Sequence, residues 1–453
     1  MLKIVVRSKR DADAVRAMLK VFYPEWNIDV VTLHGARDVG KALDILCDLI
    51  NSANFITILL GREDAELAKE LEQLLPPNVA VHVVPRARVR NTRIEHLAHE
   101  FAKARAKLRL GVKWLSDREA YRFSFCGPGE ELEEYGYDVA YDSFLLYGSG
   151  IREVLRRVLN VEIEGSVLMV RQLQGLHSVY VGKDLVATIR IPDEGLAIDT
   201  EIRRRGPYVG PSVAELLKVN MDVIHTFEKI SKHFLERYRD WADYVIVPWS
   251  GGKDSTVALL LALDVFPKSK VIAIYTDTGV EFPQTKSYVK DMVEKLGVRL
   301  VEVYAGIDKV VKYDEKPLPD HENRWCTAMK IEATERAISE IAKGNTLVVI
   351  GDRDAESEAR AQRPPVRKVN NLLYVAPIKF WGTTHVQLYL LYRGVKPNPL
   401  YELGFYRIGC YICPSLRSWE LNIILSHNEL KEVRESDLFK KFLRHKGVYK
   451  DQT

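Results

Sequence analysis

Apolar runs of strand length alternate with amphipathic, helix-like stretches near the start of the chain. The apolar runs occupy residues 2–6, 28–31, 55–59 and 79–84. Strands that alternate with helices are typical of a small sheet covered by those helices. The pattern therefore predicts an α/β domain over residues 1–110, which ends in a basic helical segment.

The pattern changes to consecutive strands further along the chain. Three apolar runs follow one another at residues 167–170, 178–181 and 185–191. Gly182-Lys183-Asp184 separates the last two runs, and such a short polar sequence between strands predicts a hairpin. We expect a β-rich middle module over residues 111–211, which resembles RNA-binding appendages such as PUA-like domains.

A helical connection leads from this module to further strands. Apolar positions at helical spacing predict one long amphipathic linking helix over residues 212–242. Val- and Ile-rich runs of strand length then follow at residues 245–248, 271–275 and 346–350. These strands define a predicted domain over residues 243–425, and a helical tail is expected over residues 426–453.

The strand at residues 245–248 leads into the sequence SGGKDS, Ser250–Ser255, and a helical pattern begins immediately after it. Adjacent glycines let backbone N–H groups approach an anion, and the helix N-terminus favours negative charge. Two serines and Lys253 add hydroxyl and ammonium donors. The pattern predicts a phosphate-binding loop. The Walker A sequence is absent, which argues against an ordinary phosphate-cleaving NTPase.

Polar residues also follow the next two predicted strands of this domain. Asp277, Thr278 and Gly279 come after one strand, and Gly351 begins the sequence GDRDAES after the other. Ligands of doubly wound sheets collect at the carboxyl ends of the strands. We expect these residues and two arginines, Arg353 and Arg360, to lie beside the loop.

Five motifs in order make this region similar to a known family. SGGKDS resembles the loop of N-type ATP pyrophosphatases, which hold the pyrophosphate of ATP while the α-phosphorus is attacked. With DTG-x-x-FPQT, GDRDAES-x-x-RA, PIKFW and NPLYELG, it resembles the phosphoadenosine phosphosulfate reductase family. The resemblance covers residues 243–418 and implies a doubly wound parallel sheet with the nucleotide across its carboxyl edge. The fold class expected for the chain is therefore multidomain α/β.

The resemblance implies that ATP adenylates an acceptor with release of pyrophosphate. Mg²⁺ is expected to bridge the phosphates near Asp254 or Asp277. Lys253, Asp254, Arg353 and Arg360 are the predicted catalytic residues, because positive charge offsets the charge that grows on the transferred and leaving groups. The predicted nucleotide-binding residues are Ser250, Gly251, Gly252, Lys253, Asp254, Ser255, Asp277, Thr278, Gly279, Gly351 and Arg353.

Three of the five cysteines stand in motifs. Cys410 and Cys413 form a CxxC, and Cys326 stands in the sequence RWCTAMK. The region resembles iron–sulfur adenylylsulfate reductases, whose Cys-Cys pair and CxxC hold a 4Fe-4S cluster, but Thr327 replaces the second cysteine of the pair. The resemblance implies a cluster with one open iron that could carry sulfide to an acceptor. A zinc site with Cys126, His321 or Glu322 as fourth ligand, and no metal at all, stay open.

The expected function is an ATP pyrophosphatase-type adenylating sulfurtransferase that acts on a tRNA or other RNA and takes sulfur from a donor. No cysteine follows Cys413, which argues against the usual reductase mechanism. The alternatives are a reductase-like enzyme, a metal-free adenylating ligase and a nucleotide-sensing protein that binds nucleic acid. The sequence leaves the oligomeric state open.

Composition adds few constraints. The chain has 453 residues, of which 47% are hydrophobic and 28% charged. It has no long apolar run and no signal-peptide pattern, so we expect a cytoplasmic protein without a membrane partner. The net charge is only +4, so any RNA site must be local. The candidates are Arg203–Arg205 and the basic segment of residues 86–109, which could equally be a solvated surface.

Overall fold

The computed structural model describes residues 1–132, 136–204, 206–313 and 316–448. Near the N-terminus lies a parallel sheet of order β2-β1-β3-β4, as the alternating pattern predicts. Its strands are β1 (Leu2–Val6), β2 (Asp29–Thr32), β3 (Phe55–Leu60) and β4 (Val79–Val83). The helices of this part are α1 (Lys9–Phe22), α2 (Val39–Asn51), α3 (Ala65–Leu74) and α4 (Ile94–Leu110). This confirms the small α/β unit.

The middle of the chain is antiparallel, with sheet order β13-β12-β11-β10-β8. Gly182 has a φ of 62° in the turn between β11 and β12, so the predicted hairpin is present. The strands are β8 (Asp142–Leu146), β10 (Val167–Arg171), β11 (Leu176–Val181), β12 (Asp184–Arg190) and β13 (Asp199–Ile202). Helix α5 (Ser149–Leu159) follows β8. Short strands β5 (Lys113–Leu115), β6 (Ala120–Arg122) and β7 (Glu130–Glu131) form a second sheet, and β9 (Ile163–Glu164) pairs with β14 (Tyr208–Val209).

The single linking helix expected from residue 212 is instead two helices, α6 (Val213–Val219) and α7 (Met221–Glu236). Asn220 separates them and is fully buried. Its side-chain amide donates to the Tyr121 carbonyl and accepts from the Phe123 N–H. The buried amide therefore bonds to the backbone of residues 121 and 123 at the point where α6 ends and α7 begins. The spacing of apolar residues alone did not indicate this break.

The six-stranded sheet has the order β17-β16-β15-β18-β20-β19, and only β19 runs antiparallel to its neighbour. Alternate residues of β15 face different cores: Val245 and Val247 pack with α7, α8 and α13, whereas Ile246 packs with α11. Helices on both faces confirm the doubly wound α/β architecture. The strands are β15 (Tyr244–Pro248), β16 (Val271–Asp277), β17 (Arg299–Tyr304), β18 (Thr346–Val349), β19 (Val366–Val369) and β20 (Leu372–Val375). The helices are α8 (Lys253–Val265), α9 (Pro283–Leu296), α10 (Ile307–Lys312), α11 (Trp325–Ile341), α12 (Glu358–Gln362), α13 (Thr383–Tyr392) and α14 (Pro399–Glu402).

Helix α4 joins the N-terminal sheet to the domain of the six-stranded sheet through buried cations. Arg105 is 1% exposed, lies 3.3 Å from the Asp354 carboxylate and stacks 4.7 Å from the Trp26 ring. Lys107 donates to the Val81 carbonyl, and Arg109 is also buried. The basic face of this helix is therefore structural, which corrects its interpretation as an RNA-contacting surface. In the basic segment, Arg86 and Arg93 are exposed.

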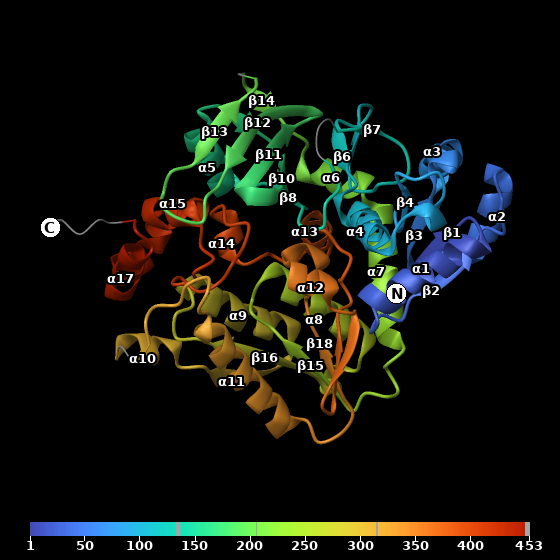
Figure 1. The fold of residues 1–453 in the computed structure, drawn as a ribbon. Helices are drawn as coiled ribbons and strands as arrows, with labels where there is room; N and C mark the ends of the chain where they lie inside the picture. The colour runs from blue at the N-terminus through green and yellow to red at the C-terminus, as the bar shows by residue number, and fades with distance from the viewer. Residues whose placement is uncertain (133–135, 205, 314–315, 449–453) are drawn as a thin grey trace.

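The chain continues in helices α15 (Ser418–Ser426), α16 (Lys431–Glu435) and α17 (Asp437–His445). Their apolar residues share a core with the middle sheet, and Figure 1 shows the middle sheet lying over α13 and α14. Across the described ranges no helix has both the length and the apolar character needed to cross a membrane.

We expect Glu420 of α15 to make stability depend on pH. Its carboxyl is 2% exposed, and burial raises its pKa from 4.5 to about 7. A raised pKa gives stability below the unfolded value that is lost as pH rises through the folded value. Urea unfolding should therefore show Glu420→Gln more stable than the wild type at pH 8 by on the order of 3 kcal/mol, and nearly equal to it at pH 4. Glu432→Gln, on the exposed side of α16, should show no such difference.

Candidate functional site

The loop Ser250–Ser255 lies at the carboxyl end of β15, where the sequence places it. Gly251 has a φ of 70°, and a Cβ there would lie 3.0 Å from a methyl group of Val289. The Ser255 hydroxyl accepts from the Ser250 N–H at 3.2 Å and donates to the Gly252 carbonyl at 3.1 Å. The two serines thus close the loop on itself, and glycine is required at its tightest point.

Helix α8 begins at the end of this loop. Gly252 is its N-cap and offers no side-chain cap. The Lys253 N–H donates to Tyr401, and the next N–H groups of the first turn are left for a ligand or solvent. The positive end of the helix dipole makes this start a favourable place for phosphate oxygens. The local geometry thus suits an anion.

Residues of two other motifs form hydrogen bonds that support the loop. The Tyr401 hydroxyl accepts from the Lys253 N–H at 3.1 Å. The Asn398 side-chain amide donates to the Gly251 carbonyl at 3.4 Å and to the Thr285 hydroxyl at 3.0 Å. The NPLY and FPQT motifs therefore fix the conformation of the loop.

Gly351 brings the end of β18 against the loop. A Cβ at this position would lie 2.8 Å from the carbonyl carbon of Asp254 and from the Ser255 nitrogen. Both are backbone atoms, so a larger residue would have to push the loop away. This close approach explains the glycine at the start of the GDRDAES motif.

A buried chain of charges runs from the loop into the middle sheet. The Asp254 carboxylate lies 2.8 Å from the Lys253 ammonium and 2.6 Å from the Arg353 Nε. Arg353 also lies 3.0 Å from the carboxylate of Asp142 in β8 and donates to the Thr383 hydroxyl at 2.8 Å. Burial disfavours both carboxylates, but the adjacent cations outweigh it and lower the pKa of Asp254 and of Asp142. Both aspartates are therefore ionised at neutral pH.

Asp277 ends β16 at the same edge of the sheet. One oxygen of its carboxylate accepts from the Gly279 N–H at 2.8 Å, and the other lies 2.7 Å from the Lys286 ammonium. Thr278 is buried and donates to the Glu281 carboxylate at 3.1 Å. Gly279 has a φ of 81°, and a Cβ at this position would clash with the side chain of Asp308. The DTG motif is thus a tight turn beside the loop.

The three motif cysteines belong to one apolar cluster between α11 and the chain that follows α14. Burial, followed by the neighbouring Cys413, raises the pKa of the Cys326 thiol. Burial, followed by the Glu281 carboxylate, raises the pKa of the Cys410 thiol, which also lies within hydrogen-bonding reach of the Thr278 hydroxyl. The cysteines are therefore neighbours, at the carboxyl edge of the sheet near Thr278.

Comparison with known proteins identifies the family. The model of the phosphoadenosine phosphosulfate reductase domain matches residues 244–416. A phosphoadenosine 5'-phosphosulfate reductase of Xanthomonas campestris pv. campestris (strain B100) is 30% identical over 38% of this chain and 70% of that protein. The chain belongs to the phosphoadenosine phosphosulfate reductase family.

Two further relatives differ in extent. An uncharacterized protein of Methanocaldococcus jannaschii is 32% identical over 46% of this chain and 44% of its own length, so the chain spans less than half of that relative. The crystal structure of phosphoadenylyl-sulfate reductase from Candida auris, a phosphate complex, is 20% identical over 43% of this chain and 96% of that chain, with a TM-score of 0.34.

Within this reductase-family domain, two predicted catalytic arginines differ in exposure. Arg353 is 2% exposed and its guanidinium is bonded to protein groups, so it orients Asp254 and is not open to a ligand in this conformation. Arg360 is half-exposed and paired with Glu356 and Asp352. Burial lowers the pKa of Arg360, but the two carboxylates outweigh it and raise the pKa overall. Arg360 is thus the more accessible of the two.

The carboxylates predicted to lie near Mg²⁺ already contact other protein groups. Each oxygen of Asp254 and of Asp277 accepts from one cation or N–H group, so Mg²⁺ would bind at their remaining lone pairs. No group of three or more His, Cys, Asp or Glu side chains among the described residues could hold a metal ion. A cubane holds its thiolates further apart than a single ion does, so the 4Fe-4S cluster on Cys326, Cys410 and Cys413 stays a prediction. Cys126 cannot complete a zinc site with them, because it is buried in a different core.

Sequence reasoning missed Tyr401, Asn398 and Asp142 as parts of this site. The first two stand in the NPLYELG motif, whose presence was noted without a role for its side chains. Asp142 had no signal, because it lies outside the family domain and reaches the loop only through Arg353.

Proposed function

We propose that the chain binds ATP with its pyrophosphate group in the loop Ser250–Ser255 and transfers the adenylyl group to an acceptor. The observation that carries the proposal is the loop itself: a glycine-lined turn, a helix start with a glycine N-cap and Lys253 together at the carboxyl edge of a parallel sheet. This combination suits phosphate oxygens and lacks the Walker A lysine arrangement.

In the proposed reaction, an acceptor oxygen attacks the α-phosphorus and the bond from this atom to the bridging oxygen breaks. Pyrophosphate leaves, and the acceptor proton passes to solvent. Lys253 has three donors, of which the Asp254 carboxylate takes one, so phosphate oxygens can occupy the others. Arg353 keeps Asp254 ionised and in place, and Arg360 is near enough to the open edge to add charge. Tyr401 holds the loop.

Analysis of the products tests this proposal. Incubation of the protein with ATP and a mixture of acceptors, including bulk tRNA, should give AMP and pyrophosphate in equal amounts. ADP and phosphate would contradict attack at the α-phosphorus. Binding of ATP without turnover would instead indicate a nucleotide sensor, and sulfite release from adenylylsulfate would indicate a reductase.

A second candidate step is sulfur transfer to the adenylated acceptor. Its support is the position of Cys410 beside Thr278, at the sheet edge where the nucleotide is proposed to bind. A sulfide-level donor would form a carbon–sulfur bond while the carbon–oxygen bond to AMP breaks, so no electrons are exchanged. Sulfide-dependent thiolated nucleosides, detected by mass spectrometry of tRNA and absent in Cys410→Ser, would support this step. Turnover with ammonia that does not depend on the cysteines would indicate an adenylating ligase.

RNA is the proposed partner, and the exposed arginines give a measurable prediction. Arg105, Lys107 and Arg109 are excluded by their structural contacts. Arg88, Arg90 and Lys103 pair with Glu63, Asp11 and Glu100, respectively, which leaves Arg86 and Arg93 as the exposed candidates in this segment. Of the second patch, Arg204 pairs with Asp184, and Arg205 lies outside the described residues. If Arg86 and Arg93 contact phosphates, the double change to Gln should flatten the slope of log K against log salt by roughly 0.7–0.9 for each phosphate that is no longer neutralised. An unchanged slope in a tRNA filter-binding assay would make them solvated surface residues.

A further inference from the structure

A cavity of about 190 Å³ lies between the middle sheet and the reductase-family domain. One wall comes from the end of β8 and the start of α5, and the opposite wall from α13, α14 and the residues after α14. Lys253 of the phosphate-binding loop also lines it. None of the described residues around the cavity belongs to β15, β16 or β18, so it is separate from the strand ends where the nucleotide is expected, yet it adjoins the loop.

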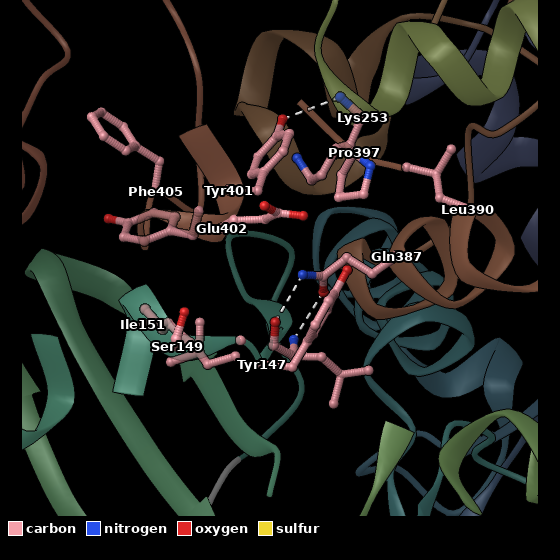
Figure 2. Close-up of a pocket in the computed structure, with 14 residues that line it drawn as sticks. Tyr147, Ser149, Ile151, Lys253, Gln387, Leu390, Pro397, Tyr401, Glu402 and Phe405 are labelled. Carbon is pink, nitrogen blue, oxygen red and sulfur yellow. Dashed lines mark hydrogen bonds between the residues drawn. The ribbon is translucent and has the colours of Figure 1, made fainter. Parts of the chain in front are cut away.

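Hydrogen bonds hold both walls in place. The Gln387 side chain of α13 accepts from the Leu145 N–H at 2.9 Å and donates to the Leu145 carbonyl at 2.8 Å. These two bonds, drawn in Figure 2, pair the edge strand β8 with α13. On the other wall, the Tyr401 hydroxyl is bonded to the Lys253 N–H. The cavity is therefore formed before any ligand arrives.

The lining is aromatic and aliphatic, with few polar groups. Tyr147, Tyr401 and Phe405 contribute rings. Figure 2 shows Tyr401 and Glu402 on one wall and Tyr147 and Ser149 on the opposite wall. Among the residues that the structure describes, none forms a recorded side-chain hydrogen bond or salt bridge with the exposed Glu402 carboxylate. Burial, followed by the Glu402 carboxylate, raises the pKa of Tyr147 to about 12, so its hydroxyl stays neutral and can donate.

These features define the chemistry of a ligand. Pockets for drug-sized molecules have roughly 300–1,000 Å³, so this smaller cavity suits a single ring and not a whole nucleotide. Rings of Tyr and Phe stack on planar bases. A carboxylate accepts from the N–H groups on the edge of a base, as Glu and Asp do with the amino group of cytosine.

We infer that this cavity binds one nucleobase of the acceptor, stacked against Tyr147 and Tyr401 with its N–H edge toward Glu402. The inference rests on the proposed function for its role, because the shared Lys253 places a base bound here next to the pyrophosphate loop. It extends that function by naming the acceptor class. The base can come from a free nucleoside or from an RNA chain.

Equilibrium binding without ATP tests the cavity separately from the reaction. The probes are cytidine, guanosine and uridine in one arm and bulk tRNA in the other; adenosine is omitted because it can enter the nucleotide site. We expect the full chain to bind at least one probe. Tyr147→Ala should weaken this binding about tenfold or more, whereas Tyr147→Phe retains the ring and should keep it. Glu402→Gln should weaken cytidine or guanosine binding about tenfold, and Glu294→Gln on the exposed side of α9 should not change it.

The outcomes separate the two proposals. Nucleoside binding that is sensitive to Tyr147→Ala identifies a free base as sufficient, and sensitivity seen only with tRNA identifies a base presented by RNA. No binding of any probe, or binding unchanged in Tyr147→Ala, overturns the inference even if pyrophosphate is released from ATP. If ATP gives no pyrophosphate while probe binding behaves as expected, the proposed reaction fails and the base site stands.

Discussion

Replacement of Arg353 by Met should lower the free energy of unfolding by about 3–5 kcal/mol, because it leaves the buried Asp142 carboxylate without its salt-bridge partner and the partly buried Asp254 with Lys253 alone. Asp254 and Asp142 lie 2.6 Å and 3.0 Å from the Arg353 guanidinium, and Asp142 is 1% exposed. Methionine keeps much of the side-chain volume, so lost packing contributes little. Urea unfolding followed by circular dichroism measures the change.

The pH dependence of this loss identifies its cause. In the wild type, the lowered pKa values of both aspartates give stability above the ordinary carboxyl pKa. Without the arginine, burial disfavours the ionised form of Asp142, whereas Asp254 keeps Lys253 at 2.8 Å. The difference between wild type and Arg353→Met should therefore grow as pH rises through the ordinary carboxyl pKa of about 4.

Two further variants complete this test. Adding Asp142→Asn to Arg353→Met should recover part of the loss, because one unpaired buried charge is removed. Arg363→Met breaks a pair with Asp352 at 3.3 Å whose arginine is 44% exposed, and should change stability by less than about 1 kcal/mol. An equal effect of Arg353→Met and Arg363→Met would show that the buried network contributes no more than a surface pair.

The fold was predictable where the local pattern is strong. The strands at residues 245–248 and 271–275 are continuous apolar runs because both of their faces are buried, and the glycines of SGGKDS mark the turn that follows. The break at Asn220 was not predictable, because its cause is a hydrogen bond to Tyr121 and Phe123, about a hundred residues away in the chain.

The sequence predicted the loop of the candidate site but not the salt bridges that hold the loop in place. Charge alone does not distinguish an arginine that meets a ligand from one that holds an aspartate. Arg353 was therefore expected to contact the nucleotide, and Arg105, in the basic segment of residues 86–109, was a candidate for contact with an RNA backbone. Each is instead neutralised by a carboxylate from another part of the chain, Asp142 and Asp354 respectively. Such pairings depend on how the domains pack, and a single sequence contains no local signal for them.

The contacts of Lys253 indicate that its main role is to bind the ligand and not to stabilise the fold. Its side chain is 8% exposed, and its recorded salt bridge joins it to Asp254, which keeps Arg353 as a second cation when the lysine is removed. Loss of one charged hydrogen bond lowers stability by roughly 1.5–3 kcal/mol, which the domain should tolerate. The missing charge at the transferring phosphate has no replacement at this position of the loop.

Lys253→Ala should therefore release pyrophosphate from ATP at least about 10²–10³-fold more slowly than the wild type, the usual loss when one preorganised electrostatic contact to a developing charge is removed. A coupled pyrophosphate assay at saturating acceptor measures the rate, and urea unfolding checks that the variant is folded. Lys290→Ala, at an exposed position of α9, is the matched control and should keep the wild-type rate. Wild-type turnover in a folded Lys253→Ala protein would remove the loop Ser250–Ser255 from the reaction, because Lys253 is the single ammonium group in this loop.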